Sequence, residues 1–307
     1  EAEPRKRVGR SRGGIQAGAY AAVIDEANLA TAVRSAQWGK KAAAVRDAAE
    51  RTARGLEIRA EYCRTSEFSR RNARGRSAQF MERPLRQSLF GRYYVEADVE
   101  AAHPTMAATA MRWAGLEATG WSELAADAQE YRRRIVEEYR RSGCAVTTSE
   151  VKRGITILLN GGSIVRWATE AAGRPVVAES LTALRAEILR FRNIAQRAFP
   201  KVSAVIQEDG RQRTTEQVRS SVVHAVMTGL EDRVLHAMEM AAGAQGWECA
   251  ALLGDGMMVR PAAGVWPESW QLVSDSWQRA VFESTGIRVK IAFKSLDGQR
   301  ADAWALA

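Results

Sequence analysis

Two acidic residues lie at the ends of apolar, β-prone runs, where a carboxylate can reach solvent. Asp98 follows the run 93–97, and Asp255 stands between two glycines within the run 252–259. Mg²⁺ is a hard ion that prefers oxygen ligands, and enzymes often place such ligands at strand ends. Each acid alone could instead be a solvated strand end or an ordinary turn residue. Together they predict a metal-dependent site.

Two carboxylates on adjacent strands suit the transfer of a nucleotidyl group. They could hold two Mg²⁺ ions roughly 3.5–4 Å apart, with Mn²⁺ as an alternative ion. One ion would lower the pKa of an attacking 3′-hydroxyl, and the other would neutralise charge on the leaving pyrophosphate. The sequence contains no Gly-x-Ser-x-Gly motif, no Walker loop and no catalytic Cys–His set that would indicate a different chemistry.

A polar, cationic helix face is predicted between the two acids. Residues 147–150 provide an N-cap for a helix that starts near Val151, and the glycine pair 161–162 bends or ends it. Polar residues recur about every four positions along one face of this helix: Lys152, Thr156, Asn160 and Ser163. Such a face could hold a triphosphate, with Lys152 or Arg153 as the charge partner. The alternative is a face that is simply solvated.

Arginines and aromatic residues are interleaved over residues 64–92. The aromatic residues are Phe68, Phe80 and Phe90. Arginine forks bind phosphates and aromatic rings stack on bases or sugars, so the segment is predicted to hold a nucleic-acid strand. The arginines selected as contacts are Arg70, Arg71, Arg74, Arg76 and Arg86. A solvated loop anchored by its phenylalanines is the alternative interpretation.

The composition of the 307 residues indicates a globular chain with a polyanionic partner. Lys and Arg number 45 against 36 Asp and Glu, for a net charge of +9, which favours nucleic acid. No run of 18 uncharged apolar residues occurs, so no membrane partner is expected. Cys63, Cys144 and Cys249 lack metal-ligand spacing, which argues against zinc sites and disulfides and favours a reducing, intracellular compartment. An opening without Met suggests a piece of a longer chain.

The elements that would position these residues are helices and short strands. Residues 15–65 are rich in Ala, Arg and Glu and are predicted to be helical. Further helices are predicted at 106–115, 122–141, 177–199, 214–242 and 266–285, and a last strand at 287–293. His224 and His236 are expected to pack or to face solvent, and Glu231 has no assigned role. The predicted fold class is α+β, a small antiparallel sheet with helices on one face and a predominantly helical remainder.

In order and spacing, these motifs resemble the palm-and-fingers core of template-dependent DNA polymerases of the A and B types. The run from Asp98 to Pro104 is similar to the first B-type motif, in which an aromatic residue and then proline follow the Asp. The resemblance implies that Asp98 and the carbonyl of Val99 bind metal. It also implies that His103 packs under the sugar and rejects a 2′-hydroxyl. The His-Pro form looks closer to divergent polymerase-like proteins of large DNA viruses and mobile elements.

The later motifs are similar to the fingers helix and the catalytic hairpin of the same family. The resemblance implies that Lys152 contacts the incoming triphosphate, whereas Asn160 occupies the position of the family's tyrosine. Asp255 would be the second catalytic metal ligand. No second acid follows it, which leaves a third carboxylate unassigned. The implied nucleotide-binding set is Lys152, Arg153, Thr156, Asn160 and His103.

The resemblance spans about residues 64–295 and implies a division of the chain. Residues 1–63 would form a basic tail and an N-terminal helical region, 64–92 the strand-binding segment, 93–120 with 200–307 the palm, and 121–199 the fingers-like helices. The expected activity is Mg²⁺-dependent addition of dNTPs to a primer–template. Lys294, or else Lys290, would contact a phosphate of the primer or of the nucleotide. Two alternatives are an RNA-directed or RNA-making polymerase with the same palm, and a non-catalytic nucleic-acid-binding remnant.

Overall fold

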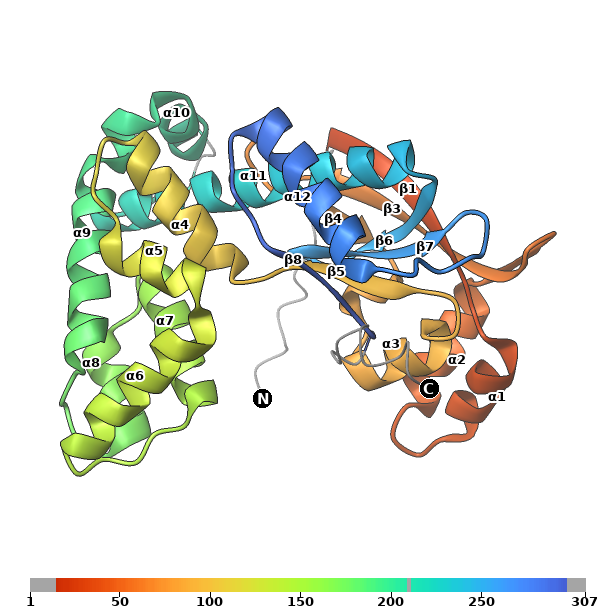
Figure 1. Cartoon of the computed structure of the whole chain (residues 1–307), viewed down its shortest axis with the longest axis horizontal. Coiled ribbons are helices and arrows are strands. Elements are labelled where there is room, and N and C mark those ends of the chain that lie inside the picture. The colour runs from red at the N-terminus through yellow and green to blue at the C-terminus, as the bar shows by residue number, and fades with distance from the viewer. Residues whose placement is uncertain (1–14, 209–210, 297–307) are drawn as a thin grey trace, which may run out of the picture.

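The structure, a computed structural model of the chain, describes residues 15–208 and 211–296 (Figure 1). The predicted basic tail, 1–14, lies outside these residues. A helical part stands beside a part built from two sheets, and helix α11 (Thr215–Ala244) extends through both. The fold class is α+β, as predicted. None of the described helices is long and apolar enough to cross a membrane.

The sheet that carries both acids has antiparallel strands in the order β6-β7-β5-β8. Their bounds are β6 (Trp247–Leu252), β7 (Gly256–Pro261), β5 (Val95–Val99) and β8 (Ile291–Lys294). Strands β6 and β7 form the predicted hairpin around Asp255, and Asp98 pairs with Gly256. Because neighbouring strands hold this register, both acids lie at the same end of the sheet.

Alternation along β5 divides its side chains between two cores. The larger core contains Val95, Ala97 and Val99, together with residues of α11 and α12 (Trp270–Thr285). The smaller core contains Tyr94 and the apolar residues of α3 (Arg83–Phe90) and of the short helix η1 (Ala78–Phe80). The prediction that helices cover one face only is therefore wrong, because α3 covers part of the second face. Glu96 and Asp98 share that second face.

The second sheet corrects the prediction that residues 15–65 are helical. Only α1 (Glu26–Arg34) and α2 (Gly39–Ala48) are helices there, and the sheet contains β1 (Ile15–Val23), β2 (Glu50–Thr52), β3 (Gly55–Arg64) and β4 (Asn72–Arg74). In β3, Ile58, Ala60 and Tyr62 are buried, whereas Arg59 and Glu61 are exposed. This alternation is the pattern of a half-buried strand. The segment therefore forms a strand although its composition is rich in helix-forming residues.

The helical part follows the predicted helices with local changes. Its helices are α4 (Ala102–Trp113), α5 (Thr119–Ala126), α6 (Ala128–Arg141), α7 (Thr148–Leu159), α8 (Ile164–Ala172), α9 (Glu179–Ala198) and α10 (Pro200–Glu208). Asp127 divides the helix predicted at 122–141, because its side chain caps α6 by accepting two backbone N–H groups. Asn160 caps the end of α7. Pro200 begins a new helix, a position that suits a residue without an N–H group.

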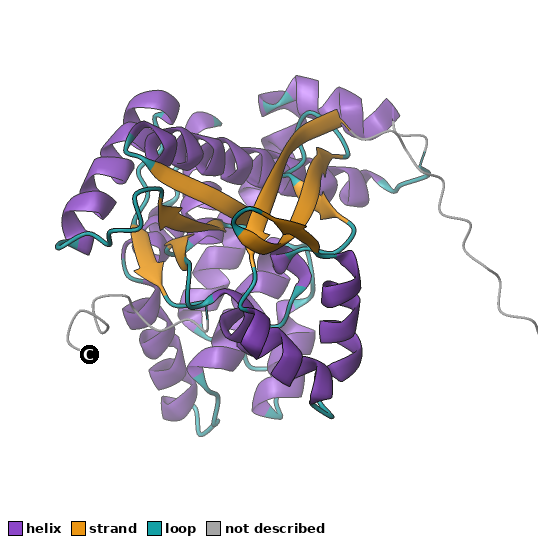
Figure 2. Cartoon of the chain, turned by 90° about the vertical axis from the view of Figure 1, so that its right-hand side faces the viewer, coloured by secondary structure: helices purple, strands orange, loops and turns teal. Residues whose placement is uncertain are grey.

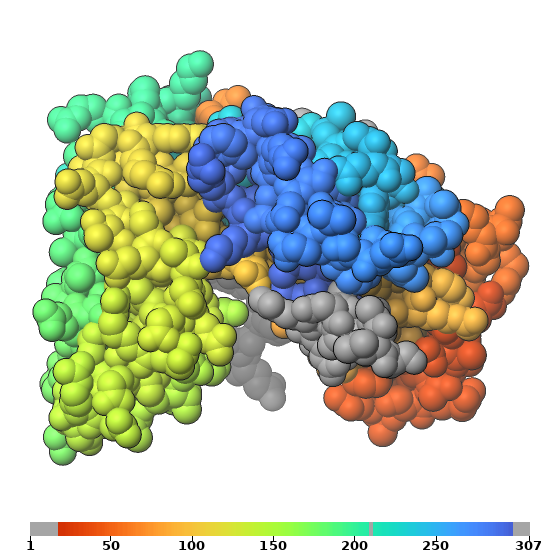
Figure 3. All heavy atoms as spheres, in the orientation of Figure 1, coloured from red at the N-terminus to blue at the C-terminus, as the bar shows by residue number. Residues whose placement is uncertain are grey.

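The helical part and the sheet part leave a hollow between them. The strands of both sheets lie among helices when the molecule is viewed from its side (Figure 2). In the space-filling view, the surface is hollowed where the helical part meets the sheet part (Figure 3). A cavity of about 740 Å³ is lined there by the end of β5, the β6–β7 turn, β8 and helices α4, α6 and α7. This cavity is where the predicted acids lie.

Candidate active site

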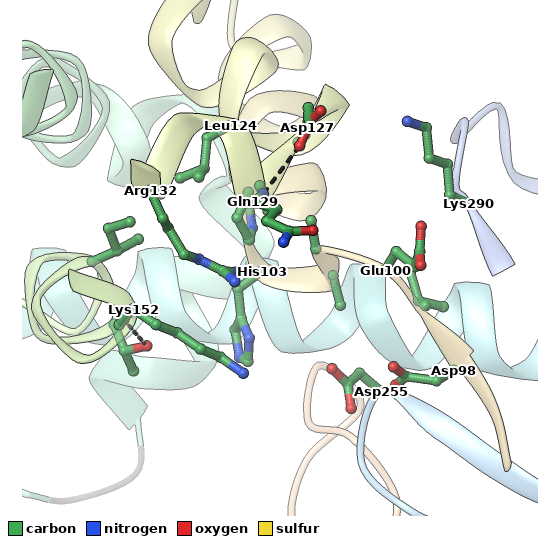
Figure 4. Close-up of a pocket in the computed structure, with 18 of the residues that line it drawn as sticks. Asp98, Glu100, His103, Leu124, Asp127, Gln129, Arg132, Lys152, Asp255 and Lys290 are labelled. Atoms are coloured by element: carbon green, nitrogen blue, oxygen red, sulfur yellow. Dashed lines mark hydrogen bonds between the residues drawn. The ribbon is translucent and has the colours of Figure 1, made fainter. Parts of the chain in front are cut away.

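The structure brings Asp98 and Asp255 together at the cavity (Figure 4). Asp98 comes from β5, and Asp255 comes from the turn between β6 and β7. The backbone N–H of Val99 donates to the carbonyl of Asp255 at 3.2 Å, which ties the tip of the hairpin to β5. The side chain of Asp98 is only 15% exposed. The two carboxylates therefore face one partly enclosed space from adjacent strands.

A left-handed turn leads from β5 into α4 and sets the place of His103. Ala101 has a φ of 50° and is the one non-glycine residue with positive φ among the described residues. An alanine in this conformation costs about 1–2 kcal/mol. The turn allows α4 to begin at Ala102, with His103 and Pro104 in its first turn, where proline is tolerated. His103 is exposed there and lines the same cavity as the acids.

The two carboxylates are held in surroundings that disfavour their charge. Burial, and then the charge of Asp255, raises the pKa of Asp98. Burial, and then the charge of Glu231, raises the pKa of Asp255. Lys294 opposes the shift at Asp98, because its ammonium group pairs with that carboxylate. Clustered, partly buried negative charge of this kind is stabilised by a cation, so the site is suited to bind one.

Glu231 adds an acidic group that the hairpin itself cannot carry. The position after Asp255 is Gly256, and a Cβ there would lie 2.7 Å from the carbonyl oxygen of Ala97, so a side chain does not fit. Glu231 is buried, raises the pKa of Asp255, and pairs with Arg70 at 3.2 Å. The sequence could not assign Glu231 to the site, because only the packing of α11 against the sheet brings it there.

The donor set fits a hard divalent cation that keeps part of its hydration. Within the described residues, no group of three or more His, Cys, Asp or Glu side chains could hold a metal ion alone. One or two carboxylates completed by water and substrate phosphates are a usual environment for Mg²⁺. Asp98 and Asp255 can supply those carboxylates, and Val99, the third predicted ligand, lines the same cavity. Mg²⁺ binding by these residues stays a prediction.

Two cations face the acids from the helical part (Figure 4). Lys152 of α7 and Arg132 of α6 line the cavity, and neither forms an ion pair with a described residue. The Nε of Arg132 is buried without a hydrogen-bond partner, and burial lowers the pKa of this guanidinium group. Its neighbours Arg133 and Arg134 pair with glutamates on the exposed surface. Sequence reasoning missed Arg132, because three consecutive arginines give no sign of which one faces a site.

Of the other residues of α7 predicted to contact the nucleotide, some line the cavity and some do not. Thr156 lines the cavity, and its hydroxyl donates to the carbonyl of Lys152 at 3.0 Å. Arg153 is exposed, Asn160 follows the last residue of α7, and neither lines the cavity. Successive residues of a helix point in different directions, so Lys152 and Arg153 cannot share one face. The structure therefore places Lys152, rather than Arg153, opposite the acids.

Two of the arginines predicted to bind nucleic acid are buried instead. The Nε of Arg71 lies 2.8 Å from a carboxylate oxygen of Asp232, and the Nη2 of Arg86 lies 3.8 Å from one of Glu96. All four side chains are at most 6% exposed. A guanidinium group that is buried and paired with an acid cannot reach a phosphate. The predicted contacts at Arg71 and Arg86 are therefore corrected to structural ion pairs.

The remaining arginines of this segment are accessible. Arg74 and Arg76 flank the turn at Gly75, are exposed, and form no ion pair with a described residue. Arg70 is 40% exposed in its pair with Glu231. Arg83, at the start of α3, lines the cavity that holds the acids. These arginines are accessible to a phosphate backbone, whereas the buried ones are not.

The two lysines predicted to lie near a phosphate have different partners. The ammonium group of Lys294 pairs with Asp98 inside the cavity. Lys290 also lines the cavity, but its Nζ donates to the carbonyl of Ala126 at 2.5 Å and is exposed. Lys294 is thus the lysine in direct contact with a predicted metal ligand.

Comparison with known proteins shows a likeness in fold. No family model matches the chain, and no curated protein matches it in sequence. Among solved structures it is similar to the POL domain of Pol1 from M. smegmatis in complex with DNA primer-template and dNTP, with a TM-score of 0.54 and 11% sequence identity. The match covers 84% of this chain and 51% of that one, so this chain spans about half its length. The fold is therefore polymerase-like.

Proposed function

We propose that this chain, whose fold resembles that of a DNA polymerase domain, adds dNTPs to a primer under the direction of a template, with Mg²⁺. The supporting observation is the distribution of charge in one cavity, where Asp98 and Asp255 face Lys152 and Arg132. Opposed charges of this kind suit a triphosphate that is bound together with a divalent cation. A net charge of +9 suits a nucleic-acid substrate.

Each side chain has a part in the proposed reaction. Asp98 and Asp255 would hold Mg²⁺, which supplies positive charge to the attacking hydroxyl and to the leaving pyrophosphate. Lys152 and Arg132 neutralise and orient the triphosphate, and the partly buried position of Arg132 strengthens its attraction. His103 packs under the sugar and excludes a 2′-hydroxyl. Holding primer and nucleotide in one geometry removes much of the entropic barrier to their reaction.

Single-nucleotide primer extension tests the proposed function. A primer–template should accept the dNTP complementary to its first unpaired base and reject the other three, and a change of that base should change the dNTP chosen. Addition should require Mg²⁺ and should stop with EDTA. Addition that ignores the template would contradict the proposal. Binding of primer–template without any addition would favour the non-catalytic remnant.

Lys152→Met or Arg132→Met should raise the KM for dNTP and leave the affinity for primer–template nearly unchanged. A hydrogen bond to a charged group contributes about 1.5–3 kcal/mol, so kcat/KM should fall roughly 10- to 100-fold. Steady-state incorporation of one nucleotide measures this fall. Arg153→Met removes an exposed cation of the same helix and is the matched control. An equal loss in the control would contradict the assignment of Lys152.

His103→Ala should reduce discrimination against ribonucleotides, because the ring that would pack under the sugar is gone. We expect the ratio of kcat/KM for dNTP to that for NTP to fall by about tenfold or more. His236→Ala, which alters an exposed histidine outside the cavity, is the control. A wild-type protein that already prefers NTPs would favour the RNA-making alternative, and an unchanged ratio would exclude His103 as the selecting residue.

The double substitution Arg74→Ala with Arg76→Ala should weaken primer–template binding and lower its dependence on salt. Each lost phosphate contact reduces the slope of log K against log salt concentration by about 0.9, so a fall of roughly one to two is expected. Fluorescence anisotropy at several salt concentrations gives the slope. Arg140→Ala with Arg166→Ala, exposed arginines already paired with glutamates, is the control. Equal slopes in both double variants would contradict the prediction.

A further inference from the structure

Lys294 lies within reach of two carboxylates of β5. Its Cα is the register partner of Glu96, whereas its ammonium group pairs with Asp98 on the same face of the strand. Side chains directly opposite each other in antiparallel strands have Cβ atoms about 4.5–5.5 Å apart, and long side chains also reach diagonal neighbours. Lys294 can therefore change its partner by rotating its side chain alone.

Glu96 is a buried carboxylate whose hydrogen bonds are incomplete. It is 4% exposed, and its Oε2 has no hydrogen-bond partner. The Nη2 of Arg86 lies 3.8 Å from that oxygen, which is too far for a hydrogen bond, and the Nε of Arg86 also lacks a partner. A buried acceptor left without a donor costs about 1–3 kcal/mol. Glu96 can therefore accept a further donor.

A divalent cation at Asp98 would compete with Lys294 for the same carboxylate. The positive charge of the cation also repels the ammonium group, and this repulsion is strong in a partly buried site. An ammonium group displaced from Asp98 favours another acceptor nearby, because the Lys294 side chain is only 23% exposed and a partly buried charge without a partner is unfavourable. The unpartnered Oε2 of Glu96, on the residue directly opposite Lys294, is such an acceptor.

We propose that Lys294 exchanges partners, pairing with Asp98 in the free protein and with Glu96 when the acidic site holds a divalent cation. Glu96 is then a positioning residue that keeps the ammonium group away from Asp98. Because the single charge of Lys294 leaves Asp98 as the two charges of the ion arrive, the net charge beside Asp98 rises by one unit instead of two. This inference rests on the proposed function, because it requires Asp98 to bind a cation.

Binding of Mn²⁺ to the protein alone tests the exchange, without nucleic acid or nucleotide. The electron paramagnetic resonance signal of free Mn²⁺ gives Kd for the wild type, Lys294→Met, Glu96→Gln and the double variant. Lys294→Met should tighten Mn²⁺ binding and Glu96→Gln should weaken it, each on the order of tenfold. In the Lys294→Met background, Glu96→Gln should have an effect of less than about threefold, because Glu96 acts through Lys294.

Additive effects in the double variant would overturn the exchange, because Glu96 would then act only through its own charge. Weaker or unchanged Mn²⁺ binding by Lys294→Met would also overturn the exchange. If Glu96→Gln fails to fold, the Kd of Lys294→Met alone tests the proposal. Glu57→Gln is the matched control, since Glu57 is another buried acid with an arginine partner, Arg54 at 2.7 Å, in the second sheet. Its Kd should equal that of the wild type.

The outcomes separate this inference from the proposed function. Template-directed extension by the wild type together with additive effects on Mn²⁺ binding would reject the exchange and retain the function. A wild-type protein that binds no Mn²⁺ and extends no primer would reject both. Non-additive effects with active extension would support both.

Discussion

Asp255→Asn should abolish nucleotide addition, with kcat falling by at least about 10³-fold, while affinity for primer–template changes little. Asparagine keeps the size of the side chain but not the charge that would hold Mg²⁺. Metal ions supply several kcal/mol of charge stabilisation in such reactions, and each 1.4 kcal/mol corresponds to a tenfold change in rate. Asp98→Asn should behave in the same way. Primer extension measures the rate, and fluorescence anisotropy measures the affinity.

Asp127→Asn provides a matched control for these substitutions. Asp127 lines the same cavity, but its side chain caps α6. Asparagine is an equally good N-cap, so this variant should keep both its stability and its activity. If both Asp98→Asn and Asp255→Asn lose primer–template affinity, the two acids are structural or bind the strand, and their assignment to the reaction fails.

The loss of activity in Asp255→Asn should not come from unfolding. Burial and the charge of Glu231 raise the pKa of Asp255 in the folded chain above its usual value of 3.8. The folded state therefore binds this proton more tightly, and stability falls as pH rises through the raised pKa. An amide does not ionise, so at pH 7 the variant should have a free energy of unfolding equal to or above that of the wild type. Urea unfolding at several pH values measures the difference, which should shrink as pH falls.

Arg71→Met should lower the free energy of unfolding by about 3–5 kcal/mol, the usual result of removing one partner from a buried ion pair. Arg71 joins the segment before β4 to α11, because it pairs with both Asp232 and Glu239. Its backbone N–H also donates to Asp232 at 3.1 Å. Methionine fills similar volume but removes the buried cation that bridges the two acids, so Asp232 keeps only Arg64 and Glu239 has no arginine partner among the described residues. Urea unfolding monitored by circular dichroism gives the value.

Arg74→Ala is the control for this stability effect. Arg74 lies three residues later, is exposed and has no ion-pair partner among the described residues, so its loss should change the free energy of unfolding by less than about 0.5 kcal/mol. Arg71→Met should lower stability and leave primer–template binding nearly unchanged. Arg74→Ala should weaken primer–template binding and leave stability nearly unchanged. A stable Arg71→Met protein with weakened primer–template binding would restore Arg71 as a phosphate contact and contradict its structural role.

Several features of the fold were predictable because they depend on neighbouring residues. The hairpin around Asp255 follows from a glycine-flanked turn between β-prone runs, and the start of α7 follows from Thr147 and Glu150, which form a reciprocal cap. The long helix α11 follows from the apolar residues that recur on one face of the predicted helix 214–242, such as Val222, Leu230 and Val234. The strands of 15–65 were missed, because Ala, Arg and Glu favour helices in isolation and only pairing with other strands stabilises them in β3.

Local periodicity, caps and turn residues specify the α+β class, the two strand-end acids and the lysine of α7, so these were predictable. Which charged groups are free to act depends on long-range packing. Packing of α11 against the sheet brings Glu231 to Asp255, whereas burial commits Arg71 and Arg86 to ion pairs. Whether a charged side chain is paired or exposed depends on residues distant in sequence, and no local pattern encodes it.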